Sequence, residues 1–248
     1  MELPALKQEF PEFKTVGSQD LQDVIERLDR AFANFFRKVR EKNRKADFPR
    51  VKSRDRYDSF TLKQAGWKLD GRYLHISNVG RLTLFLSRPV EGEIKTVTVR
   101  RTAASKWLVV FSCDNVPTRE FPGPVHEAGG IDVGATTFLA DSYGNVVENP
   151  KYFRRVQKHL ARRQRSLSRK KKGSKRLKKA RILVAKAYEK VTDKRRDFCH
   201  KTALWYVIRY NMICVESLMI LNMVRNRHLA KSIMDSAWGI FLAILSAK

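Results

Sequence analysis

Two acidic residues, Asp132 and Glu216, stand inside or at the end of short apolar runs. Asp132 lies within Gly-Gly-Ile-Asp-Val-Gly at residues 129–134, and Glu216 closes Met-Ile-Cys-Val-Glu at residues 212–216. Apolar runs of this length, bounded by glycine, are typical of buried strands. Burying an unpaired carboxylate is costly. We therefore expect either a cation beside Asp132 or a capping role for its side chain.

The spacing of the two acids allows them to meet. They are 84 residues apart, and a helical crossover of that length lets the two runs lie side by side as parallel strands in one sheet. Adjacent strands are about 4.8 Å apart. Paired carboxylates can hold Mg²⁺, which activates water and stabilises the leaving oxygen of a phosphodiester. Asp132 and Glu216 are thus predicted to be catalytic and to bind Mg²⁺.

The charge balance predicts a polyanionic partner. Lysine and arginine number 51 against 25 acidic residues, which gives a formal net charge of +26. Such an excess on a chain with 43% apolar residues indicates a folded protein with a basic surface, most often a nucleic-acid binder.

The three cysteines, Cys113, Cys199 and Cys214, form no Cys-x-x-Cys pair, so no zinc site is expected. Cys113 and Cys214 lie in apolar runs and are predicted to be packed thiols. The chain start has no signal-peptide pattern and no apolar run is long enough to span a bilayer, so a reducing cytoplasm is expected.

Most of the positive charge lies between the two acidic runs. Residues 151–201 contain 22 lysines and arginines against three acids. Apolar residues seven apart on either side of a break at Gly173-Ser174 predict an antiparallel helical hairpin over residues 150–205, with Leu167 facing Leu177 and Leu160 facing Val184. Charges of one sign along both helices favour a nucleic-acid-binding arm over a solvated face. The predicted binding residues are Arg154, Arg155, Lys158, Arg162, Arg163, Arg165, Arg169, Lys170, Lys171, Lys172, Lys175, Arg176, Lys178, Lys179, Arg195 and Arg196.

The first half of the chain changes periodicity. Apolar residues recurring from Leu21 to Val39 at spacings of three and four predict a long helix whose stripe faces the core. Residues 57–113 contain short β-branched and aromatic runs separated by glycine, typical of an antiparallel sheet or small barrel. The proline-rich stretch 114–128 is expected to be a linker between domains.

The order of these motifs resembles the TnpB family of transposon-encoded RNA-guided nucleases, relatives of the compact type V CRISPR effectors. Gly-Ile-Asp-Val-Gly at 130–134 is similar to the family's first RuvC motif, and Ile-Cys-Val-Glu-Ser-Leu at 213–218 to its second. Further similar stretches lie before the first helix (15–19), in the hairpin (172–175 and 195–201) and downstream (226–231 and 235–239).

The resemblance implies an α+β multidomain fold. Residues 1–56 correspond to part of a helical recognition element and residues 57–113 to a wedge-like β-barrel. Residues 129–248 correspond to part of an RNase H-like (RuvC) α/β nuclease domain that carries the hairpin. The implied partners are a guide RNA and target DNA, with neither a membrane nor a small-molecule substrate, and the implied location is the cytoplasm of a prokaryote, at the nucleoid.

The chain departs from the family pattern in its early recognition helices, its zinc ribbon and its third RuvC aspartate, none of which stands in the sequence. Asp141 and Asp235 are the nearest other acids; we expect Asp141 to be a turn residue and Asp235 to lie on a helix surface. The chain is thus expected to be a family member truncated at both ends, in which metal-dependent DNA cleavage is lost or impaired.

Three alternatives remain open at this point. They are a non-cleaving, repressor-like nucleic-acid-binding protein, a non-functional fragment, and an ATPase of the actin-like and sugar-kinase group. The last group shares the Gly-Ile-Asp-Val-Gly-Ala-Thr-Thr pattern, in which the carboxylate meets Mg²⁺ beside a phosphate-binding turn. Its later glycine-rich motifs are absent after Glu148.

Overall fold

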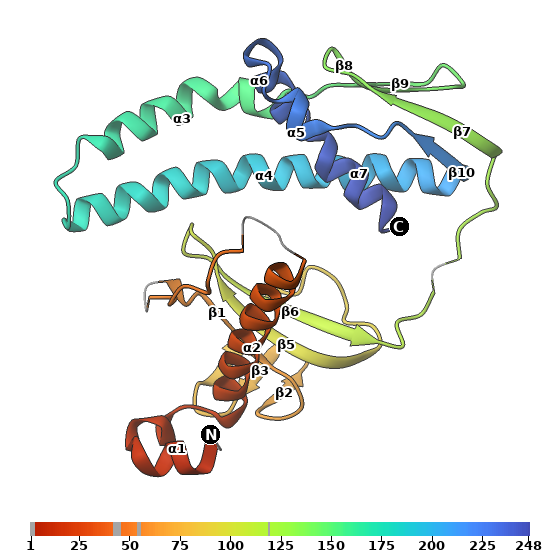
Figure 1. Ribbon diagram of the computed structural model, residues 1–248. Helices are drawn as coiled ribbons and strands as arrows, with labels where there is room; N and C mark the ends of the chain where they lie inside the picture. The colour runs from red at the N-terminus through yellow and green to blue at the C-terminus, as the bar shows by residue number, and fades with distance from the viewer. Residues whose placement is uncertain (1–2, 42–45, 54–55, 119) are drawn as a thin grey trace. The chain divides into compact units, whose positions relative to one another are not determined.

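The computed structural model describes residues 3–41, 46–53, 56–118 and 120–248. The chain divides into two compact units, Met1–Thr118 and Arg119–Lys248 (Figure 1). The division falls inside the proline-rich stretch 114–128, whose last three residues already belong to a strand.

The first unit places helices before strands. Its elements are α1 (Leu3–Glu9), the 3-10 turn η1 (Pro11–Thr15), α2 (Ser18–Arg40), β1 (Ser59–Leu62), β2 (Trp67–Asp70), β3 (Tyr73–Ile76), β4 (Gly80–Thr83), β5 (Glu93–Arg101) and β6 (Trp107–Asp114).

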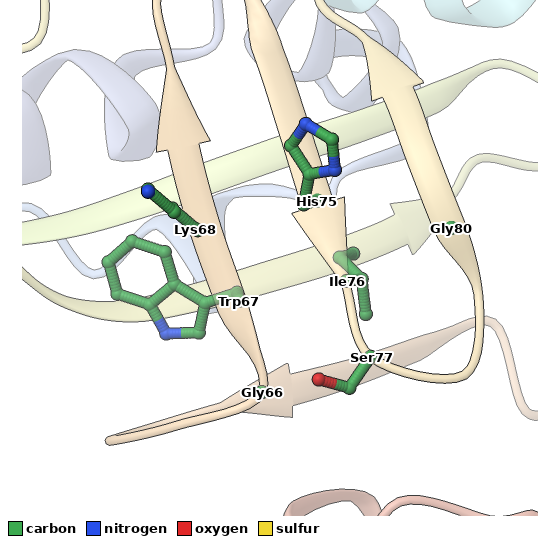
Figure 2. Close-up of a pocket in the computed structure, with 7 residues that line it drawn as sticks. All are labelled: Gly66, Trp67, Lys68, His75, Ile76, Ser77 and Gly80. Carbon is green, nitrogen blue, oxygen red and sulfur yellow. The ribbon is translucent and has the colours of Figure 1, made fainter.

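The six strands form two antiparallel sheets. One has the order β1-β5-β6 and the other, seen in Figure 2, has the order β2-β3-β4. Both sheets contribute to one apolar cluster, whose fully buried members include Leu74 of β3 and Val97 of β5. Within the described residues the strands do not close into the barrel that the sequence predicts. Two sheets facing one core bury the apolar alternation without closure.

The apolar stripe of α2 does not face a core, so that prediction is wrong. Leu28 is 52% exposed and Val39 50% exposed. Phe32 and Phe35 instead make edge-on contacts with the ring of Phe48, at centroid distances of 5.4 and 5.3 Å. The periodicity marks an apolar face but cannot tell which face of the helix meets the sheet.

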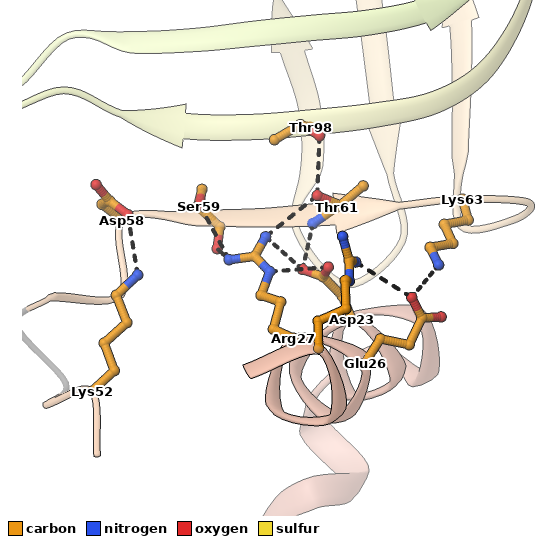
Figure 3. A network of polar contacts seen from close by, with 10 residues as sticks. Asp23, Glu26, Arg27, Lys52, Asp58, Ser59, Thr61, Lys63 and Thr98 are labelled. Atoms are coloured by element: carbon orange, nitrogen blue, oxygen red, sulfur yellow. Dashed lines mark hydrogen bonds and ion pairs between the residues drawn. The ribbon is translucent and has the colours of Figure 1, made fainter. Parts of the chain in front are cut away.

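A polar face of α2 meets the sheet instead. Gln19, Asp23 and Arg27, spaced four residues apart, follow the free edge of β1. Figure 3 shows Asp23 and Arg27 beside this strand. The Lys63 N–H donates to Gln19 (3.4 Å), the Thr61 N–H donates to Asp23 (3.0 Å), and Arg27 donates to the Ser59 carbonyl (3.1 Å).

The spacings of helix and strand explain this fit. Four helical residues rise about 6.0 Å and two strand residues about 6.7 Å, so every fourth side chain of α2 meets every second residue of β1. Asp23 is buried and also pairs with Arg27 at 2.7 Å. The helix thereby satisfies backbone groups that an edge strand leaves open.

The second unit begins with strands. Its elements are β7 (His126–Val133), β8 (Thr137–Asp141), β9 (Val146–Glu148), α3 (Tyr152–Ser168), α4 (Lys175–Arg209), β10 (Tyr210–Val215), α5 (Ile220–Met223), α6 (Arg227–Ser236) and α7 (Trp238–Ser246). The four strands form one sheet in the order β10-β7-β8-β9, in which β10 is parallel to β7 and the other pairs are antiparallel.

Helices cover one face of this sheet. Ile131 of β7 and Phe138 of β8 join Tyr206 of α4 and Phe241 of α7 in one buried cluster. Alternate residues of each strand therefore point to the opposite face. In the part of the chain that the structure describes, no single helix is long and apolar enough to cross a membrane; the bent pair α6–α7 meets that test only when its two helices are taken together.

We predict that Asp23→Ala lowers the free energy of unfolding of the first unit by about 2–3 kcal/mol, because it leaves the half-buried Thr61 N–H without its acceptor and removes the buried carboxylate that pairs with Arg27. Urea denaturation followed by circular dichroism measures the change. Asp29→Ala, an exposed carboxylate of the same helix, is the matched control. Equal effects of the two substitutions would show that the edge contact does not stabilise the unit.

Candidate functional site

Strands β7 and β10 bring the two predicted site residues together. Their parallel register pairs Gly130 with Cys214 and Ile131 with Val215, so Glu216 follows at the level of Asp132. Both acids line an open pocket of about 520 Å³, together with Asp141 and Ser142 at the end of β8. The long crossover through α3 and α4 thus produces the side-by-side placement expected from the sequence.

Both carboxylates are exposed, and the expectation that Asp132 is buried is wrong. Ile131 and Val133 point toward the helix-covered core, whereas Gly130 and Asp132 point to the open face. Because side chains alternate along a strand, one buried face is enough to account for the apolar residues of the motif. Both carboxylates are therefore accessible to a ligand from solvent.

The paired glycines before Asp132 have separate roles. A Cβ atom on Gly129 would lie 2.4 Å from the ring of Tyr210, so the absence of a side chain makes room for that ring. A Cβ atom on Gly130 would meet nothing within 4 Å, because this residue faces the open pocket. The sequence alone gave no signal for the contact with Tyr210.

Asp141 is a buried acceptor at the edge of the same pocket. It accepts hydrogen bonds from the backbone N–H groups of Tyr143 and Asn145 and from the Asn145 amide, as its predicted turn role requires. It also accepts the hydroxyl of Tyr210 at 2.9 Å and that of Tyr206 at 3.3 Å. These two contacts, which sequence reasoning missed, tie the end of β8 to the junction between α4 and β10.

The hydrogen bonds shift the titration of these groups. Burial alone raises the pKa of Asp141, but donors from Asn145, Tyr210 and Tyr143 outweigh it and lower this pKa below its ordinary value of 3.8. Burial and the nearby carboxylate raise the pKa values of both Tyr206 and Tyr210. At physiological pH, Asp141 is therefore a carboxylate that accepts hydrogen bonds from the neutral phenols of Tyr206 and Tyr210.

Aromatic ring contacts surround these hydrogen bonds to Asp141. The His126 ring stacks on Tyr143 at 3.8 Å, and Tyr210 lies 5.1 Å from His126 and 5.7 Å from Tyr206. Tyr210 is paired with His126 in the register of β10 and β7. The aromatic contacts and Asp141 thus fix where β10 begins, and with it where Glu216 ends up.

Asp235 is not a helix-surface residue, contrary to the expectation from the sequence. It is buried and accepts the backbone N–H groups of Phe153 (2.9 Å) and Arg154 (3.1 Å) at the start of α3. It also pairs with Arg195 of α4 at 2.7 Å. A carboxylate at a helix N-terminus offsets the dipole and caps free N–H groups. Asp235 thereby anchors the base of the hairpin formed by α3 and α4.

The helical hairpin carries the predicted nucleic-acid-binding residues. Helices α3 and α4 run antiparallel, and Gln164 of one donates to Tyr188 of the other at 2.6 Å. Ser174 caps α4 by accepting the Leu177 N–H. Arg163 is half-buried, and Arg195 is half-buried in its ion pair with Asp235. The remaining predicted residues are exposed: Arg154, Arg155, Lys158, Arg162, Arg165, Arg169, Lys170, Lys171, Lys172, Lys175, Arg176, Lys178, Lys179 and Arg196.

The cysteines differ in environment. Cys199 is buried in the core, and burial raises the pKa of its thiol to about 11. Cys113 is half-buried. Cys214 is exposed and lines the pocket of the two acids, so the expectation that it is packed is wrong.

The oxygen atoms of Asp132 and Glu216 suit a hard divalent cation. Within the described residues, however, no group of three or more histidine, cysteine or acidic side chains is placed to hold a metal ion. Asp141 is close in the pocket lining, but its carboxylate oxygens are occupied by the contacts described above.

Adjacent glycines provide a matched test of the site's packing. We predict that Gly129→Ala lowers the free energy of unfolding by about 1–3 kcal/mol, because the added methyl group overlaps the Tyr210 ring. Gly130→Ala should change the free energy of unfolding by less than about 0.5 kcal/mol, because the added methyl group meets no neighbouring atom. Chemical denaturation of both variants decides, and a larger loss for Gly130→Ala would contradict the assignment.

The lowered pKa of Asp141 predicts a pH dependence of stability. Since its folded pKa is depressed, its contribution is present above its ordinary pKa of 3.8 and is lost as pH falls through the folded value. Asp141→Asn should cost about 2 kcal/mol at neutral pH. The difference in Tm from wild type should narrow below pH 3.8 in a thermal-unfolding series. The exposed carboxylate variant Asp193→Asn is the control, and a pH-independent difference for Asp141→Asn would contradict the assignment.

Comparison with known proteins identifies relatives of this architecture. A model of the OrfB_IS605 family, described as "Probable transposase", matches residues 112–227, which include both acidic strands and the hairpin. The chain is 36% identical over 239 residues to a "Putative RNA-guided DNA endonuclease" of Streptomyces pristinaespiralis, covering 94% of the chain and 57% of that protein.

It is also 32% identical over 218 residues to the "Putative RNA-guided DNA endonuclease InsQ" of Escherichia coli (strain K12), covering 86% of the chain and 51% of that protein. The chain thus spans about half the length of the curated relatives it matches. These similarities extend across both units and agree with the motif order, and the chain belongs to the TnpB family of OrfB-type, transposon-encoded proteins.

Proposed function

We propose that this chain carries the first two acidic strands of an RNA-guided DNA endonuclease site of the TnpB type, together with an arm that binds the nucleic acid. The observation that carries the proposal is the parallel register of β7 and β10, which places Asp132 and Glu216 on one open face. The strand order β10-β7-β8-β9 supports an RNase H-like (RuvC) fold for this unit. Both relatives are named as RNA-guided DNA endonucleases.

The proposed chemistry is metal-assisted phosphodiester hydrolysis. Asp132 and Glu216 would hold Mg²⁺ through their carboxylate oxygens, and the cation supplies charge stabilisation and a nucleophilic water when bound. Their exposure leaves both groups open to a cation from solvent. Two carboxylates would hold a cation less firmly than a larger set of ligands would. We therefore infer that the 248-residue polypeptide cleaves DNA poorly.

The helical hairpin supplies the proposed binding surface. Its exposed lysines and arginines lie on both helices, and Asp235 fixes its base beside the sheet. Neutralising many phosphates releases counterions, which makes affinity fall steeply with salt. Guide RNA and target DNA are the proposed partners, by the names of the relatives.

The same geometry supports a second candidate, a nucleic-acid-binding protein that does not cleave. It is favoured by the two-carboxylate site in the described part of the chain. Membership of a transposase family argues against the actin-like ATPase alternative. That group resembles this chain only in the short sequence pattern around Asp132.

A plasmid-cleavage assay with guide RNA and Mg²⁺ tests the proposal. The 248-residue polypeptide should bind guide RNA with a steep salt dependence and should nick or cut target plasmid no faster than its Asp132→Ala variant. Asp193→Ala, an exposed acid of the hairpin, controls for the change in charge.

The outcomes separate the candidates. Turnover that disappears in Asp132→Ala and persists in Asp193→Ala would overturn the inferred loss of cleavage and establish the site. Absence of salt-dependent binding to either RNA or DNA would overturn the assigned function altogether.

A further inference from the structure

The apolar stripe of α2 has the spacing of a coiled-coil seam. Its members alternate at intervals of four and three residues: Leu21, Ile25, Leu28, Phe32, Phe35 and Val39. Such intervals place side chains in one line along a helix, at the a and d positions of a heptad repeat. We call these six residues the α2 seam.

The contacts of α2 with the sheet turn this seam outward. Gln19, Asp23 and Arg27, which bind β1, occupy the b, f and c positions of the same heptad repeat. These positions lie on the side of the helix opposite to a and d. Ile25 is accordingly 40% exposed, and Leu28 is exposed still further. A line of exposed apolar side chains on a folded domain marks an interaction surface.

The two halves of the seam differ in size. Its second half is aromatic and wide, because Phe32 and Phe35 contact Phe48, which is itself 62% exposed. Phe36 broadens this half further by stacking on Phe32 at a centroid distance of 6.3 Å. The first half consists of aliphatic side chains alone. A partner that fits the seam therefore presents small side chains to one half and large ones to the other.

A second α2 helix in antiparallel orientation meets this requirement. The intervals of the seam, four-three-four-three-four, read the same in both directions, so a twofold axis beside residue 30 places every member opposite another. Phe32 then meets Leu28 of the second copy, and Phe35 meets Ile25. Each ring faces an aliphatic side chain, whereas parallel pairing would set ring against ring.

The charges of α2 favour the same orientation. Residues 18–29 contain four acids and one base, and residues 30–40 contain four bases and no acid. An antiparallel pair places the acidic half of each helix beside the basic half of the other, and a parallel pair places like charges together. Asp29 flanks the midpoint and faces its own counterpart, but it is exposed, so solvent screens that repulsion.

We propose that the α2 seam is a self-association surface at which a second copy of this chain pairs in antiparallel orientation. The helix is already ordered by its contacts with β1, so the free energy of association does not include that of forming a helix. The seam is short for a coiled coil, and we expect a reversible dimer with a micromolar dissociation constant. The proposal goes beyond the proposed function and does not depend on it.

Sedimentation equilibrium of the full 248-residue chain without nucleic acid, from low to high micromolar concentration, measures the association. Leu28→Glu places a charge in the middle of the seam and should raise the dissociation constant by at least about tenfold. The matched control is Asn34→Glu, which adds the same charge at an exposed position of α2 outside the seam and should keep the wild-type value. Circular dichroism checks that both variants are folded.

Two outcomes of that experiment would overturn the proposal. One is a wild-type chain that remains monomeric at the highest concentration. The other is an equal dissociation constant for Leu28→Glu and Asn34→Glu, which would show that the chain associates through another surface.

Disulfide trapping tests the orientation. In a Cys214→Ser background, which removes the exposed native cysteine, chains with Ile25→Cys are mixed with chains with Phe35→Cys and oxidised. Antiparallel pairing should give dimers that join the two variants, in excess over dimers of either variant with itself, as counted by mass spectrometry. An excess of like pairs would contradict the antiparallel arrangement, and so would equal trapping when Leu28→Glu is added to both chains.

Discussion

The strand arrangement of the second unit depends on one buried carboxylate, that of Asp141. Asp141 joins the turn after β8 to the phenols at the end of α4 and the start of β10. Because a strand placed one residue out of register presents the opposite face, this anchor decides which side chains of β10 reach the open pocket. Gly129 contributes by leaving room for the Tyr210 ring. The exposed acids Asp132 and Glu216 are thus positioned by a buried acid.

Much of the site was readable from the sequence because chemistry and topology leave a strong pattern. An acid at each of two apolar runs, with a long helical crossover between them, is enough to predict a parallel pair of strands and a shared pocket. The basic hairpin follows from heptad spacing and a glycine break. The sequence pattern could not predict that the Asp132 side chain is exposed. The run around Asp132 is apolar because alternate residues enter a core, and a sequence does not say whether one or both faces are covered.

The errors elsewhere have related causes. The stripe on α2 was assigned to a core, yet Asp23 and Arg27 of another face hold the sheet. Asp235 was assigned to a surface, yet it caps α3 from a helix far along the chain. In each case a polar side chain makes a long-range contact that local periodicity does not encode.

The order of elements in the first unit has a consequence for synthesis. Chains emerge from the ribosome N-terminus first, so α2 is complete before β1 appears. The side chains that satisfy the free edge of β1 are therefore already displayed on a helix when that strand is made. On that edge, the emerging strand has no row of open N–H and C=O groups to offer to another nascent chain on the same message, while its other edge pairs with β5. Helix α2 thus protects one edge of β1 from pairing with another chain during synthesis.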